Sequence, residues 1–152
     1  MYGLEVKSIE TLMGEDGAEA TPEREGVAVL PGQKLQVMVG DKVRVRATLS
    51  YRGTALSDYF YGAIGARGPL GFDEIVTGQV AISFPQCLDW TPFELTVDIP
   101  ITSAIDPKPD YDLYVKIKGH TEAGLPEVDN CIDVIGAPEF QDFKIVSYEK
   151  VV

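Results

Sequence analysis

The chain has 152 residues, 45% of them apolar, and 24 acidic against 13 basic side chains, which gives a net charge of −11. This length fits one domain with a sizeable core. The composition is that of an ordinary globular protein, which excludes disorder for the chain as a whole. The negative charge argues against binding to nucleic acid or to anionic membrane surfaces, and no apolar run approaches the ~20 residues of a membrane-spanning helix.

The beginning of the sequence predicts three short strands, at residues 4–12, 27–30 and 35–39. No basic stretch followed by an apolar one precedes them, as a signal peptide would require. We therefore expect a cytoplasmic or virion-associated protein, unless a leader has been removed. Residues 15–25 are acidic, lack a hydrophobic stripe and contain Pro22, which predicts an exposed loop or hairpin tip.

The clearest strand covers residues 42–51, where apolar and polar side chains alternate. One face carries Val43, Val45, Ala47, Leu49 and Tyr51. The other face carries Lys42, Arg44 and Arg46, a basic stripe that is unusual on an acidic protein. In the immunoglobulin-like strand order that segments described below resemble, this strand would pair with residues 93–101, whose outward Glu94 and Asp98 would meet the stripe. The alternative is a contact surface for another copy or for an acidic partner.

The middle of the chain predicts a long hairpin. Tyr59, Phe60 and Tyr61 are consecutive, so at least one of the three rings faces away from the core. The glycine-rich run at residues 62–71 is not a phosphate-binding loop, because no Lys-Ser/Thr pair follows it and no helix begins there. Small residues in a strand permit a bulge or the close approach of another backbone. Since a strand resumes at residues 71–75, we expect the hairpin to project from the sandwich.

The remaining chain continues the alternation between turns marked by glycine and proline. Further buried rows are predicted at residues 80–84, 93–101, 111–118, 128–134 and 143–148. Ten prolines and fifteen glycines leave little room for a helix of ten residues. The sequence predicts an all-β fold, an antiparallel sandwich formed by residues 1–152 as a single domain. Its core would span about residues 27–136, with terminal strands at 4–12 and 140–149 packed on it, the first beside the last.

Three segments resemble parts of an immunoglobulin-like β-sandwich. They are residues 40–55, where a strand follows Gly40-Asp41, residues 109–115, and the acidic residues 127–134. Over residues 34–135 the chain is similar to the bacterial and archaeal ectodomain family described as cell-adhesion-related. The resemblance implies an immunoglobulin-like fold in which Tyr111 forms a tyrosine corner, with its ring on the core and its hydroxyl on nearby backbone. Residues 59–84 and the two terminal strands lie outside the pattern, and a sandwich lineage in virion proteins would explain the missing leader equally well.

The carboxylates supply the only metal candidates. They cluster before two strands, as Asp106, Asp110 and Asp112 and as Glu127, Asp129 and Asp133. If these segments meet at one end of the sandwich, their oxygens suit calcium, although the spacing is not that of an EF-hand loop. The simpler interpretation is a set of solvated loop acids. No pair of carboxylates is selected by its spacing for glycoside hydrolysis.

The remaining chemistry-bearing residues are few. Cys87 and Cys131 are far apart in the sequence and are expected to be reduced thiols. With the single His120 they form no zinc-ligand spacing, and His120 is predicted to be a solvated loop residue. Trp90 is placed in a loop at residues 88–93. There it either stacks on a sugar ring, together with Tyr59 and Tyr61, or plugs the open end of the core.

These observations predict a non-catalytic protein with no cofactor, which acts by contact with other protein chains. The expected setting is self-association or a larger assembly, such as a virion component (a phage decoration or tail module) or a surface assembly. No nucleic-acid binding and no membrane insertion are expected. The alternative is a carbohydrate-binding or adhesion module that uses Trp90 and the nearby tyrosines.

Overall fold

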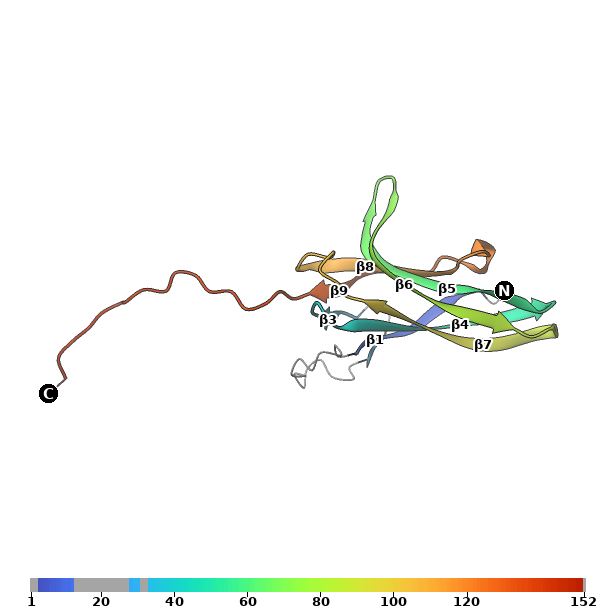
Figure 1. The fold of residues 1–152 in the computed structure, drawn as a ribbon, viewed down its shortest axis with the longest axis horizontal. Coiled ribbons are helices and arrows are strands. Elements are labelled where there is room, and N and C mark those ends of the chain that lie inside the picture. The colour runs from blue at the N-terminus through green and yellow to red at the C-terminus, as the bar shows by residue number, and fades with distance from the viewer. Residues whose placement is uncertain (1–2, 13–27, 31–32, 152) are drawn as a thin grey trace.

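The computed structural model describes residues 3–12, 28–30 and 33–151, and there the chain is almost entirely β-structure (Figure 1). The elements are β1 (Glu5–Leu12), β2 (Ala28–Val29), β3 (Leu35–Val37), β4 (Lys42–Gly53), β5 (Leu56–Gly68), β6 (Gly71–Phe84), β7 (Cys87–Pro100), β8 (Lys108–Ile117), the short 3-10 helix η1 (Thr121–Ala123) and β9 (Glu127–Val134). The predicted loop at residues 15–25 lies outside the described residues. No helix in the described part of the chain is long and apolar enough to cross a membrane.

The strands form two sheets, which confirms the all-β prediction. One sheet has the order β2-β1-β4-β7 and the other the order β3-β9-β8-β5-β6. Every pair is antiparallel except β3 and β9, which run parallel through Leu35–Val37. The arrangement is therefore mixed, whereas the sequence predicted an antiparallel one.

A single apolar core lies between the two sheets. The predicted alternation of β4 is confirmed, since Val43, Val45 and Ala47 are fully buried while the side chains between them are not. From the other sheet, Leu113 and Val115 of β8 enter the same core cluster. Because alternate side chains of a strand point to opposite faces, one apolar row from each sheet suffices to fill this layer.

The long hairpin of β5 and β6 is confirmed, and its far end rises out of the sandwich (Figure 1). The pairing of the two strands shifts between Ile64 and Gly65, where the glycine-rich run predicted a bulge or a close approach. A Cβ on Gly65 would lie 1.9 Å from the Asp73 carbonyl oxygen, so only glycine fits there. The tip carries Leu70, whose side chain is fully exposed.

The predicted first strand is present but has other neighbours than expected, and the predicted last strand is missing. Residues 4–12 do join a sheet, as β1, but their neighbours are β2 and β4 rather than the last strand. The strand predicted at residues 140–149 is absent from the structure, so this prediction was wrong. The chain leaves β9 and extends away from both sheets (Figure 1).

β9 is already flanked on both sides, by β8 and β3, where the last segment leaves it. The final three residues of β9 already pair with β3, and Ile135 N–H donates to the Val37 carbonyl. Asp142 also takes a left-handed φ of 58°, which interrupts the extended alternation. Alternation alone therefore does not make a strand, because a strand also needs a partner for its backbone groups.

Candidate functional site

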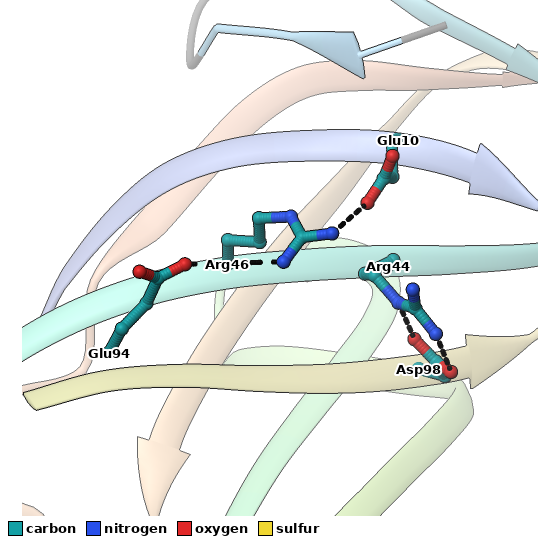
Figure 2. Close-up of polar contacts among 5 residues, drawn as sticks. All are labelled: Glu10, Arg44, Arg46, Glu94 and Asp98. Carbon is teal, nitrogen blue, oxygen red and sulfur yellow. Dashed lines mark hydrogen bonds and ion pairs between the residues drawn. The ribbon is translucent and has the colours of Figure 1, made fainter. Parts of the chain in front are cut away.

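The two arginines of the basic stripe of β4 pair with acidic side chains of their own sheet. Figure 2 shows Arg44 of β4 facing Asp98 of β7, with Nε and Nη2 2.8 and 3.0 Å from the two carboxylate oxygens. Arg46 lies 2.8 Å from Glu10 of β1 and 4.0 Å from Glu94 of β7. These cross-strand pairs stabilise the sheet, each by roughly 0.2–1 kcal/mol.

The calcium candidates lie among cationic side chains of the same chain. Arg67 contacts Glu127 and lies 2.9 Å from Asp129. Lys34 contacts Asp110, which raises the pKa of Lys34 through that hydrogen bond, and it lies 3.5 Å from Asp133. The end of the β5 strand thus meets the start of β9, but an arginine stands between the carboxylates.

Asp112 and Asp106 both accept hydrogen bonds from other residues of the domain. Asp112 is almost buried, and its carboxylate accepts the N–H groups of Arg67 and Asn130 at 2.9 and 2.8 Å. The carbonyl of Asp106 accepts the hydroxyl of the buried Tyr111 at 2.6 Å. This is the geometry that the tyrosine-corner prediction required. Among the described residues, no group of three or more His, Cys, Asp or Glu side chains is placed to hold a metal ion.

The predicted aromatic set is not brought together. Tyr59 and Tyr61 lie on the outer face of β5, beside Tyr114 and Lys116 of β8 and Lys118 just after it. We call these five residues the tyrosine–lysine face. Glu74 ties two of its rings together, since it accepts the Tyr61 hydroxyl at 2.5 Å and also the Tyr114 hydroxyl. Burial, followed by this hydrogen bond, raises the pKa of Tyr114. Trp90 belongs to the other sheet.

Trp90 lies within β7, not in the predicted loop. The strand begins early because β4 extends to Gly53, which pairs with Cys87, and Tyr51 pairs with Thr91. Half of the Trp90 side chain is exposed, and the Arg52 guanidinium carbon lies 4.6 Å from the centre of the indole ring. The indole forms part of the wall of a cavity at the end of the sandwich.

This end pocket has a volume of about 310 Å³ and is mainly apolar. It is lined by Gly3, Leu49, Ser50, Tyr51, Arg52, Leu56, Phe84, Trp90, Ile117, His120, Glu122 and Ala123. Tyr51 and Phe84 form its aromatic wall, with stacked rings whose centres are 4.7 Å apart. Sequence analysis identified only Trp90 of this set, because the pocket is assembled from both sheets and from η1.

His120 is held by a carboxylate at the rim of the end pocket, whereas the sequence predicted a solvated loop histidine. Its Nδ1 lies 2.6 Å from Oδ2 of Asp58, which also accepts the Gly119 N–H at 3.1 Å. The hydrogen bond to the Asp58 carboxylate raises the pKa of His120. Burial alone would raise the pKa of Asp58, but its hydrogen bonds with His120 and with two backbone N–H groups lower it.

Both thiols are free. Cys131 is fully buried in β9, and burial raises its pKa to about 12. Cys87 is partly exposed at the start of β7, close to the end pocket's strand β4. Since the thiolate is the reactive form, Cys131 is chemically inert in the folded protein.

The C-terminal segment, residues 137–151, is the most unusual surface of the described chain. It contacts neither sheet, and its large apolar side chains stand in solvent. Those more than four-fifths exposed are Phe140, Phe143, Ile145, Val146, Tyr148 and Val151. Contiguous exposed apolar surface of this kind marks an interaction site in most proteins. No known family model matches the chain, and no curated protein matches its sequence.

Proposed function

We propose that this protein is a non-catalytic, immunoglobulin-like β-sandwich module that works by contact with other protein chains. The observation that carries the proposal is the C-terminal segment, in which six large apolar side chains are exposed. A chain that acted alone in water would gain free energy by folding them away, at about 25 cal/mol for each Å² buried. Their exposure is accounted for if another protein surface covers them.

Two features support the immunoglobulin-like part of the proposal. The two sheets share one core, and the Tyr111 hydroxyl bonds to the Asp106 carbonyl as a tyrosine corner does. The parallel pair of β3 and β9 is compatible with this assignment, because sandwiches of this class differ in how their edge strands pair.

The setting that we propose is a virion, as a decoration or tail component, or a surface assembly. Virions and surface assemblies both need modules that bind other proteins and catalyse no reaction. The net charge of −11 supports a protein partner over nucleic acid or an anionic membrane surface, since both of these require basic patches. Electron microscopy of particles that contain the tagged protein would test the virion setting.

The test of the function is self-association of the full chain. Sedimentation velocity between about 1 and 100 µM should show mass rising with concentration. Replacing Phe143, Ile145 and Tyr148 together by serine should lower that mass. Replacing only Lys144 by serine, with Ser147 and the rest of the segment unchanged, should not lower it. If the unmodified chain sediments as a monomer throughout and retains no partner, the proposal is wrong.

A second candidate is carbohydrate binding at the end pocket, favoured by one observation. Trp90 is half exposed on a cavity that also presents Ser50 and Glu122, and indole rings stack on sugars. The cation of Arg52 already covers the ring, and Tyr59 and Tyr61 lie on the other sheet. A glycan array probed with the unmodified chain and with Trp90→Ala tests this candidate. Sugar binding by the unmodified chain that is lost in the variant would support it.

A further inference from the structure

We propose that the end pocket binds the C-terminal segment of a second copy of this chain, so that copies join head to tail. This inference rests on the proposed function, and it adds the partner and the place of contact. The two surfaces are complementary in chemistry: one is an unfilled apolar cavity and the other is a row of apolar side chains without a cavity.

The two surfaces lie at opposite ends of the molecule. The end pocket is bounded by Arg52 at the end of β4 and by Ala123 of η1. The C-terminal segment leaves from the other end, where the last residue of β9 pairs with Lys108, the first residue of β8 (Figure 1). To reach its own pocket, the segment would have to turn back along the whole sandwich. A neighbour aligned end to end presents its pocket directly.

The segment has the reach that this contact needs. Fifteen residues, 137–151, span at most about 54 Å when fully extended. The 14 residues of β7 span roughly 46 Å, so the segment is about as long as the sandwich it must approach. Its first large side chain, Phe140, follows only four residues after Gly136, which places the aromatic residues near the junction.

The pocket fits side chains better than a large ligand. Its volume of about 310 Å³ is at the lower limit for ligand sites, which run roughly from 300 to 1,000 Å³. Its aromatic wall of Tyr51 and Phe84, with Trp90 beside it, suits one or two rings such as Phe140 and Phe143. Aromatic anchors seated in a pocket dominate the free energy of many protein interfaces.

Charge favours this segment as the occupant. Copies of a chain with net charge −11 repel one another, but the segment carries three acids and two bases, a net charge of only −1. The pocket rim presents the guanidinium of Arg52, and also Glu122 and His120, of which the latter is already paired with Asp58. The Glu139 and Asp142 carboxylates of the incoming segment can meet the guanidinium of Arg52.

A head-to-tail contact joins two different surfaces, so a bound pair of copies still offers one free pocket and one free segment. Such heterologous contacts close into rings or continue as filaments. This property gives a sharp test with full-length variants. Trp90→Ala damages the pocket but keeps the segment, and Phe143→Ser does the reverse.

The experiment is sedimentation velocity of each variant alone and of their 1:1 mixture. Each variant alone should associate at least about tenfold more weakly than the unmodified chain. The mixture should form a heterodimer and stop there, because it contains one intact pocket for one intact segment. Tyr59→Ala is the matched control, since Tyr59 is about as exposed as Trp90 but lies on the tyrosine–lysine face. It should associate like the unmodified chain.

Trp90 is the only tryptophan, so its fluorescence reports on the pocket directly. The emission of the unmodified chain should shift to shorter wavelength as concentration rises, and that of Phe143→Ser should not. A shift that is present at every concentration, and lost in Phe143→Ser, would show docking within one chain and overturn the proposal. If Trp90→Ala associates normally, the pocket is wrong and the proposed function stands. If the unmodified chain does not associate with itself at all, the head-to-tail contact is wrong, and the proposed function is wrong as well only if the chain also retains no other protein partner.

Discussion

The imidazole of His120 and the carboxylate of Asp58 lie 2.6 Å apart, although 62 residues separate them in the chain. Asp58 belongs to β5 and His120 precedes η1, so the pair ties the turn after β8 to the neighbouring strand. The Gly119 N–H donates to the same carboxylate. One rim of the end pocket is therefore held by a group whose charge changes within the physiological pH range.

This pair should make stability depend on pH in a defined window. The raised pKa of His120 stabilises the fold fully below its ordinary value of 6.5, and that contribution is lost as pH rises through the raised pKa. The lowered pKa of Asp58 stabilises the fold above 3.8, and that contribution is lost as pH falls through the lowered pKa. The pair therefore stabilises most between about pH 4 and 6.5.

Urea unfolding of the unmodified chain and of His120→Gln measures the effect. The difference in free energy of unfolding should be larger at pH 5 than at pH 8.5. Asp58→Asn combined with His120→Gln separates the pair from other titrating groups, because the pH-dependent difference should vanish once Asp58 has lost its charge. An equal difference at both pH values would contradict the assignment.

Gly78→Ala should destabilise the protein by about 1–3 kcal/mol. A Cβ on Gly78 would lie 2.0 Å from the Asp98 carbonyl oxygen, so the backbones of β6 and β7 would have to separate. Gly68→Ala is the matched control, since its Cβ would meet the nearest atom at an ordinary 3.6 Å. Thermal unfolding followed by circular dichroism compares them, and equal losses in the two variants would count against the close approach.

Tyr111→Phe should cost about 0.5–1.5 kcal/mol of stability, because it removes the hydroxyl that bonds to the Asp106 carbonyl while the ring stays in the core. Tyr59→Phe, on the exposed outer face of β5, should change stability by less than about 0.5 kcal/mol. Chemical denaturation of both variants gives the comparison. A neutral Tyr111→Phe would mean that the hydroxyl bond contributes nothing to the fold.

The two thiols should react in sequence with a disulfide reagent such as DTNB. Cys87 is partly exposed and should react in the native protein, whereas Cys131, fully buried and with its pKa raised to about 12, should react only after unfolding. Absorbance should report one thiol per chain in buffer and two in denaturant. Cys87→Ser is the control, and it should show none in buffer.

Local alternation was sufficient to place Arg44 and Asp98 on the outer faces of β4 and β7. That the two strands pair was an expectation from the immunoglobulin-like strand order, and the structure confirms it. The same alternation misled at residues 140–149, because the chain runs on from β9 without pairing with any strand of the two sheets. Pattern therefore predicts which face a residue takes, and topology decides whether the strand exists.

The local sequence pattern could not predict the end pocket, and the reason is a different one. Trp90 was expected in a loop because Asp89 and Pro92 flank it, yet the extension of β4 to Gly53 recruits these residues into β7. His120 and Asp58 meet only after β5 and β8 have paired, through contacts such as Phe60 with Ile117. Both sites depend on which strands become neighbours, and that information is spread over the whole chain.

The pairing of β9 also has a mechanical consequence. Any pull on the C-terminal segment reaches the domain through β9, which is hydrogen-bonded to β8 on one side and to β3 on the other. The pull runs along the strand, so it shears the bonds of Leu35–Val37 and of β8 together instead of opening them one at a time. A strand held on both sides in this way is suited to carry tension from one module to the next.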